Sequence, residues 1–559
     1  MKETTQYSLK AAISRFYKLI NMERGEITSV YFYAAISGFI LLSLPLGIQA
    51  ITNLLFGGTV STSLIVLIIV VVAGVFFNGV LQVLQMQATE RIQQRIFARL
   101  TFAYAYRIPR INLLSVDDYY LPELVNRFFD TAGLQKGMSK LLIDFPAATI
   151  QVFFGLILLC FYHPVFIAFA FLLIAIVLII FYLTGPLGFR TSMQESDYKY
   201  SVAHWLEEIS RSIKTFKFHQ SHELHLKKTD ELVSGYLYSR NAHFAVLVSQ
   251  YKVLIGFKVL ITASMLIIGS ILFIKQQINL GQFIAAEIII ITVLNSIEKM
   301  IVSLEVVYDV LTSHEKLNKV LDKPNDHDRS SAAPRPFAET PGIDIKIYDL
   351  DFGYPNKKEI IKKLNLQIKA GEKVCITGSE GSGKSTLLRL LTGIYPDFSG
   401  NILFNDVPLK LIPRADLHAR VAVYLSEEEL FSGSLLENLT VGNDKISFED
   451  IYKACEIVGL HTYTNQQPEG YQTMLDPQGK KLSYNTIQKI LLARCLLMKP
   501  SLLLMEDGWM SVEPAVKDQV IDYLTDTNNA FTLIAVSNDL TFGGKCTRVL
   551  QMDKGALTQ

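Results

Sequence analysis

Long uncharged stretches separate charged ones along the first half of the chain. Residues 31–55 and 63–87 contain no charged side chain, and each is long enough as a helix to cross about 30 Å of hydrocarbon. Comparable apolar stretches follow at about 141–162, 165–184, 253–275 and 281–303. The pattern therefore predicts six membrane-spanning helices, with the start and the end of the set on the same side of the bilayer.

The charges in the connections between the spans predict which ends of the helices face the cytoplasm. The connection "FGGTVSTS" between the first two spans is short and neutral, whereas the segment from "ERIQQRIFARL" to "YRIPRI" is dense in arginine. By the positive-inside rule, this segment and the N-terminus lie in the cytoplasm. The inner connections, about 88–140 and 185–252, are long and carry alternating charge, so we expect the membrane helices to continue into the cytoplasm. Residues 1–28 mix basic and apolar side chains without a small-residue cleavage site, which predicts an interfacial helix rather than a signal peptide.

Polar side chains inside the spans are candidates for function because they are costly in lipid. Lys258 is near the inner end of its span, where a lysine can extend its ammonium to the interface. Glu287 follows "FIAA" and precedes "IIIITVL" near the outer side, and Asn295 lies two turns further along. Both should face other helices or a wet cavity, and for Glu287 a substrate pathway and helix packing both remain open. Glu287 and Lys258 should lie at different depths, so we predict no ion pair between them.

Composition agrees with a membrane protein. The chain has 559 residues, of which 50% are hydrophobic, and a mean hydropathy of +0.29. A net charge of +1 gives no general attraction to nucleic acid, so we expect no nucleic-acid partner. The five cysteines are widely spaced and form no C-x-x-C pair, which argues against a disulfide framework or a zinc site. They are Cys160, Cys375, Cys455, Cys495 and Cys546.

The second half has a different pattern. The helical periodicity runs to about Asp322, and a linker rich in Pro, Ser and charge follows at 323–341. Beyond it, apolar and polar residues alternate as in strands. The fold class expected is a membrane all-α six-helix domain plus an α/β P-loop nucleotide-binding domain. The expected boundaries are 1–28 for the interfacial helix, 29–322 for the membrane domain, 323–341 for the linker and 342–559 for the nucleotide-binding domain.

A phosphate-binding loop follows the second of these strands. Gly378, Gly383, Lys384 and Ser385 satisfy G-x-x-x-x-G-K-[ST], between a strand and a helix as the motif requires. Glycines let successive backbone N–H groups close on phosphate oxygens at the positive end of the helix. Lys384 is expected to contact the outer phosphates and Ser385 to hold Mg²⁺, so ATP and Mg²⁺ are the expected cofactors. The remaining nucleotide-binding candidates of the loop are Ser379, Gly381, Ser382 and Thr386. Tyr354, upstream in "FGYPN", is a candidate for stacking on adenine.

Taken together, these elements resemble the ATP-binding cassette exporters, specifically a half-transporter in which six spans precede one nucleotide-binding domain. The matching segments are "FGYP", "GSEGSGKST", "LFSGSLLENL", "LSYNTIQKILLARCLL" and "SLLLMEDG". The inner segments "LPELVNRFFD" and "VAHWLEEISRSIKTFKF" look like the family's intracellular loops. The resemblance implies a homodimer or a heterodimer with another half-transporter. Each ATP would then lie between one subunit's phosphate loop and the other's signature, where Ser483 reaches phosphate.

The resemblance also implies a multi-pass protein of the cytoplasmic membrane, with its nucleotide-binding domain in the cytoplasm, that exports a substrate. The membrane half looks somewhat like the transporters of type I protein or peptide secretion, although lipids and small amphiphiles remain open. Only about thirty residues precede the first span and no cysteine lies among them, so we expect no peptidase domain and no leader cleavage.

Several nucleotide-site positions depart from the family pattern. The signature LSGGQ is Leu482-Ser483-Tyr484-Asn485-Thr486, so two glycines that allow close backbone approach are replaced, and we expect weaker closure of the ATP sandwich. The Gln-loop glutamine is replaced by Ser426 or Glu427, depending on alignment.

The acids and the switch residue are changed as well. The resemblance places Glu506 at the Mg²⁺ position and Asp507 at the position that polarises the attacking water, the reverse of the family's Asp-Glu order. Asp507 is one methylene shorter than the usual base, and a displacement of about 1 Å can cost on the order of 10²-fold in rate. Asn538 replaces the switch histidine, and Glu513 stands where the family has Asp.

These departures leave two hypotheses open. The first is an exporter with slow or partner-dependent ATP hydrolysis, and the alternative is a catalytically weak regulatory ATP-binding subunit of a membrane complex. A mixed dimer would not repair every departure, because this chain's signature serves one ATP site while its Asp507 and Asn538 serve the other.

Overall fold

The computed structural model describes residues 8–41, 43–56, 62–116, 120–219, 223–326, 341–354, 358–425, 429–506 and 513–558. Most of the predicted linker, Ser426, Glu427 and Asp507 lie outside these residues. The chain divides into two compact units, which are described separately. The helical unit comprises 1–110 and 118–323, and the nucleotide-domain unit comprises 111–117 and 324–559.

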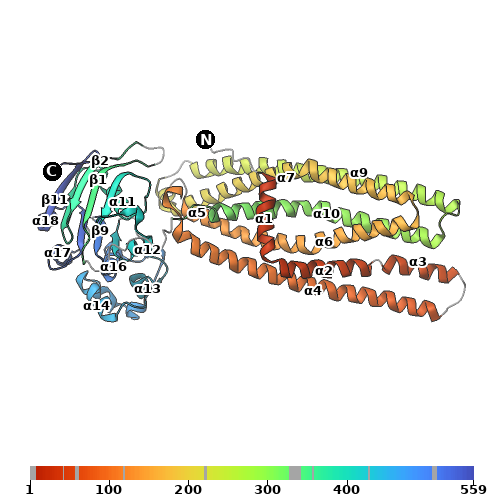
Figure 1. Cartoon of the computed structure of the whole chain (residues 1–559), viewed down its shortest axis with the longest axis horizontal. Coiled ribbons are helices and arrows are strands. Elements are labelled where there is room, and N and C mark those ends of the chain that lie inside the picture. Colours follow the sequence, from red (N-terminus) through yellow and green to blue (C-terminus); the bar gives the residue numbers. More distant parts are fainter. Residues whose placement is uncertain are drawn as a thin grey trace. The chain divides into compact units, whose positions relative to one another are not determined.

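Long helices dominate the helical unit. Within the described residues, six helical segments are long and apolar enough to cross a membrane. They are Arg24–Leu55, Thr62–Arg110, Leu121–Tyr162, Val165–Arg211, Leu224–Ile274 and Leu280–Leu321. Each segment contains one predicted span. The helices that include the predicted inner connections continue well beyond their spans, as expected. Figure 1 shows these helices alongside one another, with α1 lying across them.

The helices of this unit have the following bounds. They are α1 Leu9–Met22, α2 Arg24–Leu41, α3 Ser43–Phe56, α4 Thr62–Arg107, η1 Ile108–Arg110, α5 Leu121–Asn126, η3 Arg127–Phe129, α6 Asp130–Tyr162, α7 Val165–Arg211, α8 Ile213–Phe218, α9 Leu224–Ile274 and α10 Leu280–Leu321.

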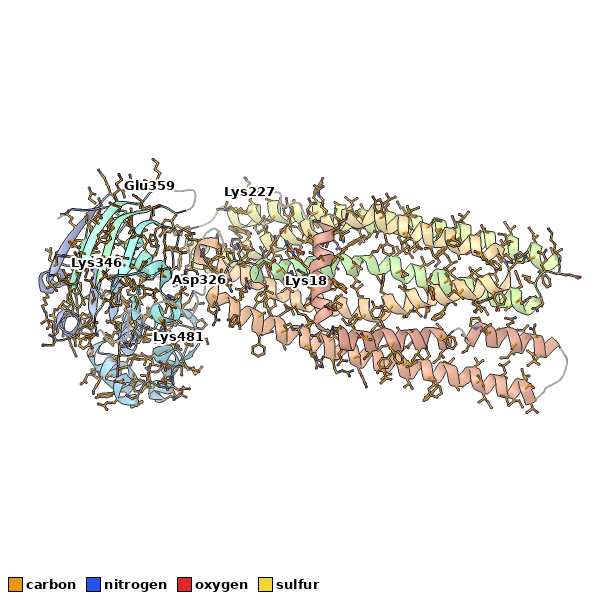
Figure 2. All side chains as sticks on the ribbon, in the orientation of Figure 1. Lys18, Lys227, Asp326, Lys346, Glu359 and Lys481 are labelled. Atoms are coloured by element: carbon orange, nitrogen blue, oxygen red, sulfur yellow. The ribbon has the colours of Figure 1, made fainter. Side chains whose placement is uncertain are left out.

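The helix α1 is the predicted N-terminal helix. It begins after Ser8, whose hydroxyl accepts a hydrogen bond from the Ala11 N–H at 3.5 Å. Ala12 and Leu19 are buried against the helical unit, while Tyr17 is 65% exposed. Lys18, labelled in Figure 2, is also exposed. One face of α1 is therefore packed on the long helices, and an exposed face combines apolar and basic side chains as an interfacial helix requires.

Lys258 forms an ion pair that the sequence did not indicate. Its Nζ donates a hydrogen bond to Glu298 Oε2 at 2.6 Å, from α9 to α10. We expected this lysine to extend to the interface, but an acid on the neighbouring helix is within closer reach. Among the described residues, no hydrogen bond or ion pair joins Glu287 to Lys258, in agreement with the prediction that the two do not pair.

The nucleotide-domain unit is an α/β structure. Its strands are β1 Ile345–Phe352, β2 Ile361–Ile368, β3 Lys373–Thr377, β4 Ser399–Phe404, β5 Val407–Pro408, β6 Val421–Tyr424, β7 Gly433–Ser434, β8 Met474–Leu475, β9 Leu502–Glu506, β10 Thr532–Val536, β11 Arg548–Asp553 and β12 Ala556–Thr558. Its helices are η2 Leu113–Val116, α11 Lys384–Leu391, η4 Leu409–Leu411, α12 Arg414–His418, α13 Leu435–Thr440, α14 Phe448–Ile457, α15 His461–Gln466, η5 Gly470–Gln472, η6 Pro477–Gly479, α16 Tyr484–Leu497, α17 Pro514–Thr525 and α18 Leu540–Lys545.

Among the described residues, the main sheet has the strand order β12-β11-β3-β10-β9-β6, and a second sheet has the order β2-β1-β4-β5. The neighbours β11, β3, β10, β9 and β6 are parallel. In β9 and β10 every residue is buried, which explains why these strands are apolar apart from one end residue each, Glu506 and Thr532, rather than alternating. Successive side chains of β9 pack on opposite faces: Leu504 joins a core shared with the second sheet and α11, while Met505 joins a core under α13, α14 and α16.

A short segment before the second membrane helix pair belongs to this unit. Ile111 forms an antiparallel bridge with Asn325, and the Asn112 N–H donates to the Pro324 carbonyl at 2.9 Å. Asp326, labelled in Figure 2, pairs with Arg414 at 2.6 Å. The domain boundaries predicted from composition did not separate 111–117 from the membrane domain.

Candidate functional site

The phosphate-binding loop joins β3 to α11 as the sequence predicts. Gly378, Gly381 and Gly383 have φ values of 149°, 76° and 102°. A Cβ on Gly378 would lie 2.2 Å from the Met552 carbonyl oxygen, so this position accepts glycine alone. Because Gly383 precedes Lys384, the first residue of α11, the loop ends at a helix N-terminus, where unpaired N–H groups attract anions.

Lys384 lies over this loop. Its Nζ donates to the Gly378 carbonyl at 2.9 Å, the Ser379 carbonyl at 2.7 Å and the Ser382 hydroxyl at 3.2 Å. Burial lowers the pKa of Lys384, while the carboxylates of Glu380 and Glu506 act in the opposite direction. The ammonium is thus held where phosphate oxygens would replace carbonyl oxygens as its acceptors.

The other loop candidates differ in exposure. Ser379 and Gly381 are exposed, Ser385 is half-buried, and Ser382 and Thr386 are buried. The exposed backbone at Ser379 and Gly381 is accessible to a phosphate. Ser382 instead packs inside the loop, where its carbonyl accepts the Gly555 N–H at 3.0 Å.

Neighbouring parallel strands bring the remaining chemical groups to the same edge of the sheet. Val536 of β10 is in register with Ile376 of β3 on one side and with Glu506 of β9 on the other. Asn538 follows β10 by two residues, as Gly378 follows Ile376, and the Gly378 N–H donates to Asn538 Oδ1 at 3.2 Å. Glu506 is the last residue of β9 and is 7% exposed. The loop, Asn538 and Glu506 therefore converge at one edge of the sheet.

The position of Asn538 depends on its neighbour Asp539. Asp539 caps α18 by accepting the Thr541 N–H at 2.9 Å, and it pairs with Lys517 of α17. The Lys517 ammonium, followed by the Thr541 and Phe542 N–H groups, holds the pKa of Asp539 below its ordinary value, against a smaller effect of burial. Sequence reasoning missed Lys517, because only the fold brings α17 beside the residues that follow β10.

Tyr354 lies in an aromatic group beside α11. Its ring meets that of Tyr395 edge to face, with centroids 5.6 Å apart, and lies 5.2 Å from that of Phe352. Arg389 Nη1 donates to the Tyr354 hydroxyl at 3.4 Å. Stacking on adenine remains a prediction, and the structure adds Tyr395 and Arg389 as residues that fix the ring. Tyr395 lies in the sequence "GIYP", which follows the helix after the phosphate-binding loop, and this sequence could have indicated it.

The altered signature begins α16. Ser483 is its N-cap, with the Thr486 N–H donating to Ser483 Oγ at 3.1 Å, and it is exposed. Tyr484 is 53% exposed. The helix is attached to the strand before the Gln-loop position, since the Tyr424 hydroxyl donates to Gln488 Oε1. Glu513, after the acidic segment, is 3.4 Å from Lys489 of α16.

These residues fit ATP with Mg²⁺. A Cβ at Gly378 would clash with the Met552 carbonyl oxygen, and the Lys384 ammonium donates to the Gly378 carbonyl in the same loop. A hydroxyl at Ser385 and a carboxylate at Glu506 are the oxygen ligands that Mg²⁺ prefers. Bound ATP would supply the phosphoanhydride bonds for hydrolysis. Asp507, the candidate base, lies outside the described residues.

Comparisons with known proteins agree with this geometry. A family model described as "ABC transporter transmembrane region" matches residues 28–297, and one described as "ABC transporter" matches residues 361–508. A solved structure titled as a bacterial Atm1-family ABC exporter with ATP bound superposes with a TM-score of 0.85, covering 96% of this chain and 94% of that one at 16% identity.

Curated relatives match over shorter stretches. The ABC-type transporter kk1G of Curvularia clavata is 35% identical over 35% of this chain and 15% of its own length. The lactococcin-G-processing and transport ATP-binding protein LagD of Lactococcus lactis is 29% identical over 38% of this chain and 30% of its own length. The matches thus span less than a third of either relative.

The two family models leave residues 1–27, 298–360 and 509–559 unmatched. The fold neighbour extends the likeness over nearly the whole chain. The chain therefore belongs to the ATP-binding cassette transporter family, with the half-transporter architecture of its exporters: a helical membrane domain followed by one nucleotide-binding domain.

Proposed function

We propose that this chain is half of an ATP-driven exporter of the cytoplasmic membrane. Two nucleotide-binding domains close on Mg-ATP and switch the membrane halves between inward-open and outward-open states. The observation that carries this proposal is the convergence of Lys384, Asn538 and Glu506 at adjoining strand ends. Lys384 and the loop amides bind the phosphates, Ser385 and Glu506 hold Mg²⁺, and Asp507 polarises the attacking water.

Orientation follows from charge. Beyond its apolar part, α4 carries Arg91, Arg95 and Arg99, which pair with Glu23 and Glu26 at the start of the first span. By the positive-inside rule this end of the helix lies in the cytoplasm, and with it the nucleotide-binding domain.

The functional unit is a dimer, either of two copies or with another half-transporter. Ser483 supports this proposal because it is exposed at the N-terminus of α16, where it is accessible to a nucleotide held by another subunit. A helix N-terminus with an exposed hydroxyl is suited to binding a phosphate.

The substrate class proposed is a peptide or protein. The likeness to LagD, a lactococcin-G-processing and transport ATP-binding protein, supports this class. Lipids and small amphiphiles are the competing classes, and a substrate screen on the intact chain distinguishes them.

Hydrolysis is expected to be slow, because Asp507 is short and Asn538 replaces a group that can carry charge. One observation favours the alternative of a regulatory subunit that binds ATP without hydrolysing it. Tyr484 is 53% exposed at the signature, so its bulk stands where a close backbone approach to phosphate is needed.

The decisive experiment is Mg-ATP hydrolysis by the purified chain alone in lipid nanodiscs, with ATP binding measured separately. The exporter proposal predicts turnover that both Lys384→Ala and Asp507→Asn abolish, with Asp507→Asn still binding ATP. Binding without turnover in the unsubstituted chain would favour the regulatory subunit and direct the search to a partner.

A further inference from the structure

The helix α10 has an exposed polar stripe in its membrane portion. Successive spacings of four, four, three and four residues place one set of side chains on a single face of the helix: Glu287, Ile291, Asn295, Glu298 and Val302. Ile291 and Val302 are 54% and 53% exposed, and Asn295 is also exposed. This face is named here the α10 stripe. Ile291, Asn295 and Val302 are thus not covered by the described helices of the unit, whereas Glu287 and Glu298 are half-buried.

The opposite face of α10 is fully packed. Ala285, Ile289 and Val293 are each at most 1% exposed, and Ser296 donates to Gln151 Oε1 of α6 at 2.7 Å. A Cβ on Gly155 of α6 would lie 2.6 Å from Val293 Cγ2, so the two helices are in close contact. The stripe is therefore the free side of a helix whose other side is fixed in the bundle.

The acids of the stripe differ in their partners. Glu298 receives hydrogen bonds from Lys258 Nζ at 2.6 Å and from the Tyr251 hydroxyl at 3.1 Å, so α9 neutralises its charge. Glu287 lies three turns away, and no ion pair or hydrogen bond reaches its carboxylate from the part of the chain that the structure describes. Its Oε1 is buried without an acceptor or donor partner among those residues.

A carboxylate without a cation is expensive inside a membrane span, and such residues face a water-filled cavity or another protein surface rather than lipid. An ionised Glu287 side chain therefore calls for a cation from outside the described residues.

We propose that the α10 stripe lines the transport pathway and that Glu287 binds a positively charged group of the substrate. The ligand is an organic cation with apolar flanks, because Ile291 is exposed beside the carboxylate on the same face. The pathway role rests on the proposed export function, whereas binding of the cation does not require ATP hydrolysis. The charged group can come from a lysine of a peptide or from the ammonium of an amphiphile.

The test is equilibrium binding to the full chain in nanodiscs without nucleotide, with empty nanodiscs as the blank. One probe pair is an apolar peptide carrying a single lysine and the same peptide with norleucine. The other pair is dodecyltrimethylammonium and the analogue in which carbon replaces the nitrogen. The unsubstituted chain should bind the charged member of at least one pair about tenfold more tightly than the neutral member, and the responding pair identifies the source of the charge.

Glu287→Gln should remove this preference while leaving the neutral probe's affinity unchanged, and Glu287→Asp should retain most of it. Glu298→Gln is the matched control on the same helix, and it should reduce the preference by less than about threefold because Lys258 already neutralises Glu298. The proposal is overturned if the unsubstituted chain shows no preference in either pair, if Glu287→Gln retains it, or if both Gln variants lose it equally. Loss of ATP turnover with the preference intact would instead count against the export function alone.

Discussion

The backbone N–H of Gly378 donates a hydrogen bond to the side-chain oxygen of Asn538 at 3.2 Å. This contact joins the first glycine of the phosphate-binding loop to the residue that we predict to replace the family's switch histidine. It forms because β3 and β10 are adjacent and in register, so the residues two positions beyond Ile376 and Val536 meet. An amide that accepts through Oδ1 still has Nδ2 to donate, and Asn538 can therefore hold the loop and a phosphate oxygen together.

Removing this side chain should weaken nucleotide binding. Asn538→Ala deletes one hydrogen bond of about 1 kcal/mol, so the Kd for ATP should rise about fivefold. Asn538→Asp keeps the acceptor but places a carboxylate beside phosphate, and it should raise Kd further. Binding of a fluorescent ATP analogue in nanodiscs measures both, and an Asp variant with unchanged affinity would show that Asn538 does not reach the phosphates.

Lengthening the candidate base should speed hydrolysis. Asp507→Glu restores the methylene that the family's base has, and turnover should increase on the order of tenfold because proton abstraction depends on distance. The affinity for ATP should stay the same, since binding depends on the loop. Steady-state phosphate release provides the measurement. If Asp507→Glu changed the affinity for ATP as much as it changed the turnover rate, a role of Asp507 in the chemical step alone would be contradicted.

The signature departure makes a separate prediction. Tyr484→Gly removes bulk from the turn that would approach the partner's nucleotide, so ATP turnover should rise several-fold without loss of stability, because the Tyr484 side chain is 53% exposed. Ser483→Ala in the same background is the control, and it should remove the gain by deleting both the phosphate contact and the N-cap of α16. If Tyr484→Gly leaves ATP turnover unchanged, closure of the two nucleotide-binding domains on ATP does not limit the turnover rate.

The Asp539–Lys517 pair should make stability depend on pH. The pKa of Asp539 is lowered from its ordinary value of 3.8, first by the Lys517 ammonium. Because the folded-state pKa is the lower one, the stabilisation is fully present above pH 3.8 and is lost as the pH falls through the folded value. Asp539→Asn should therefore lower the thermal midpoint at pH 7, and the difference should shrink below pH 3.8.

The exposed Asp518 of α17 provides the matched control. Asp518→Asn changes the net charge by the same amount as Asp539→Asn, but Asp518 does not cap α18. It should shift the midpoint less than Asp539→Asn at pH 7. Equal shifts for the two variants, or a difference that persists at low pH, would contradict a stabilising role for the pair.

Local patterns predicted the features that depend on neighbouring residues. The spacing of Gly378, Gly383 and Lys384 indicated the loop, and the uncharged stretches indicated the spans, because both depend on a few consecutive residues. The acceptor of Lys258 was not predicted, since Glu298 is forty positions away and is reached only when α9 packs on α10. Tyr395, Arg389 and Lys517 were missed for the same reason, because their partners lie on other elements.

Some positions remain predictions. Asp507 and the Gln-loop replacements Ser426 and Glu427 lie outside the described residues, so their assignment rests on the family order of motifs alone. Glu506 lies at the end of a buried strand beside the loop, which agrees with a metal-holding role.

The central claim is that ATP at this site moves the membrane domain, and pulsed dipolar spectroscopy tests it directly. Spin labels at Gln277→Cys, in an exposed turn before α10, report the distance between two copies in nanodiscs once the partly accessible Cys160 and Cys546 are replaced. The account predicts a distance distribution that shifts when Mg-ATP is added and that does not shift in Lys384→Ala. An unchanged distribution in a preparation that binds ATP, or no dipolar signal between copies, would contradict it.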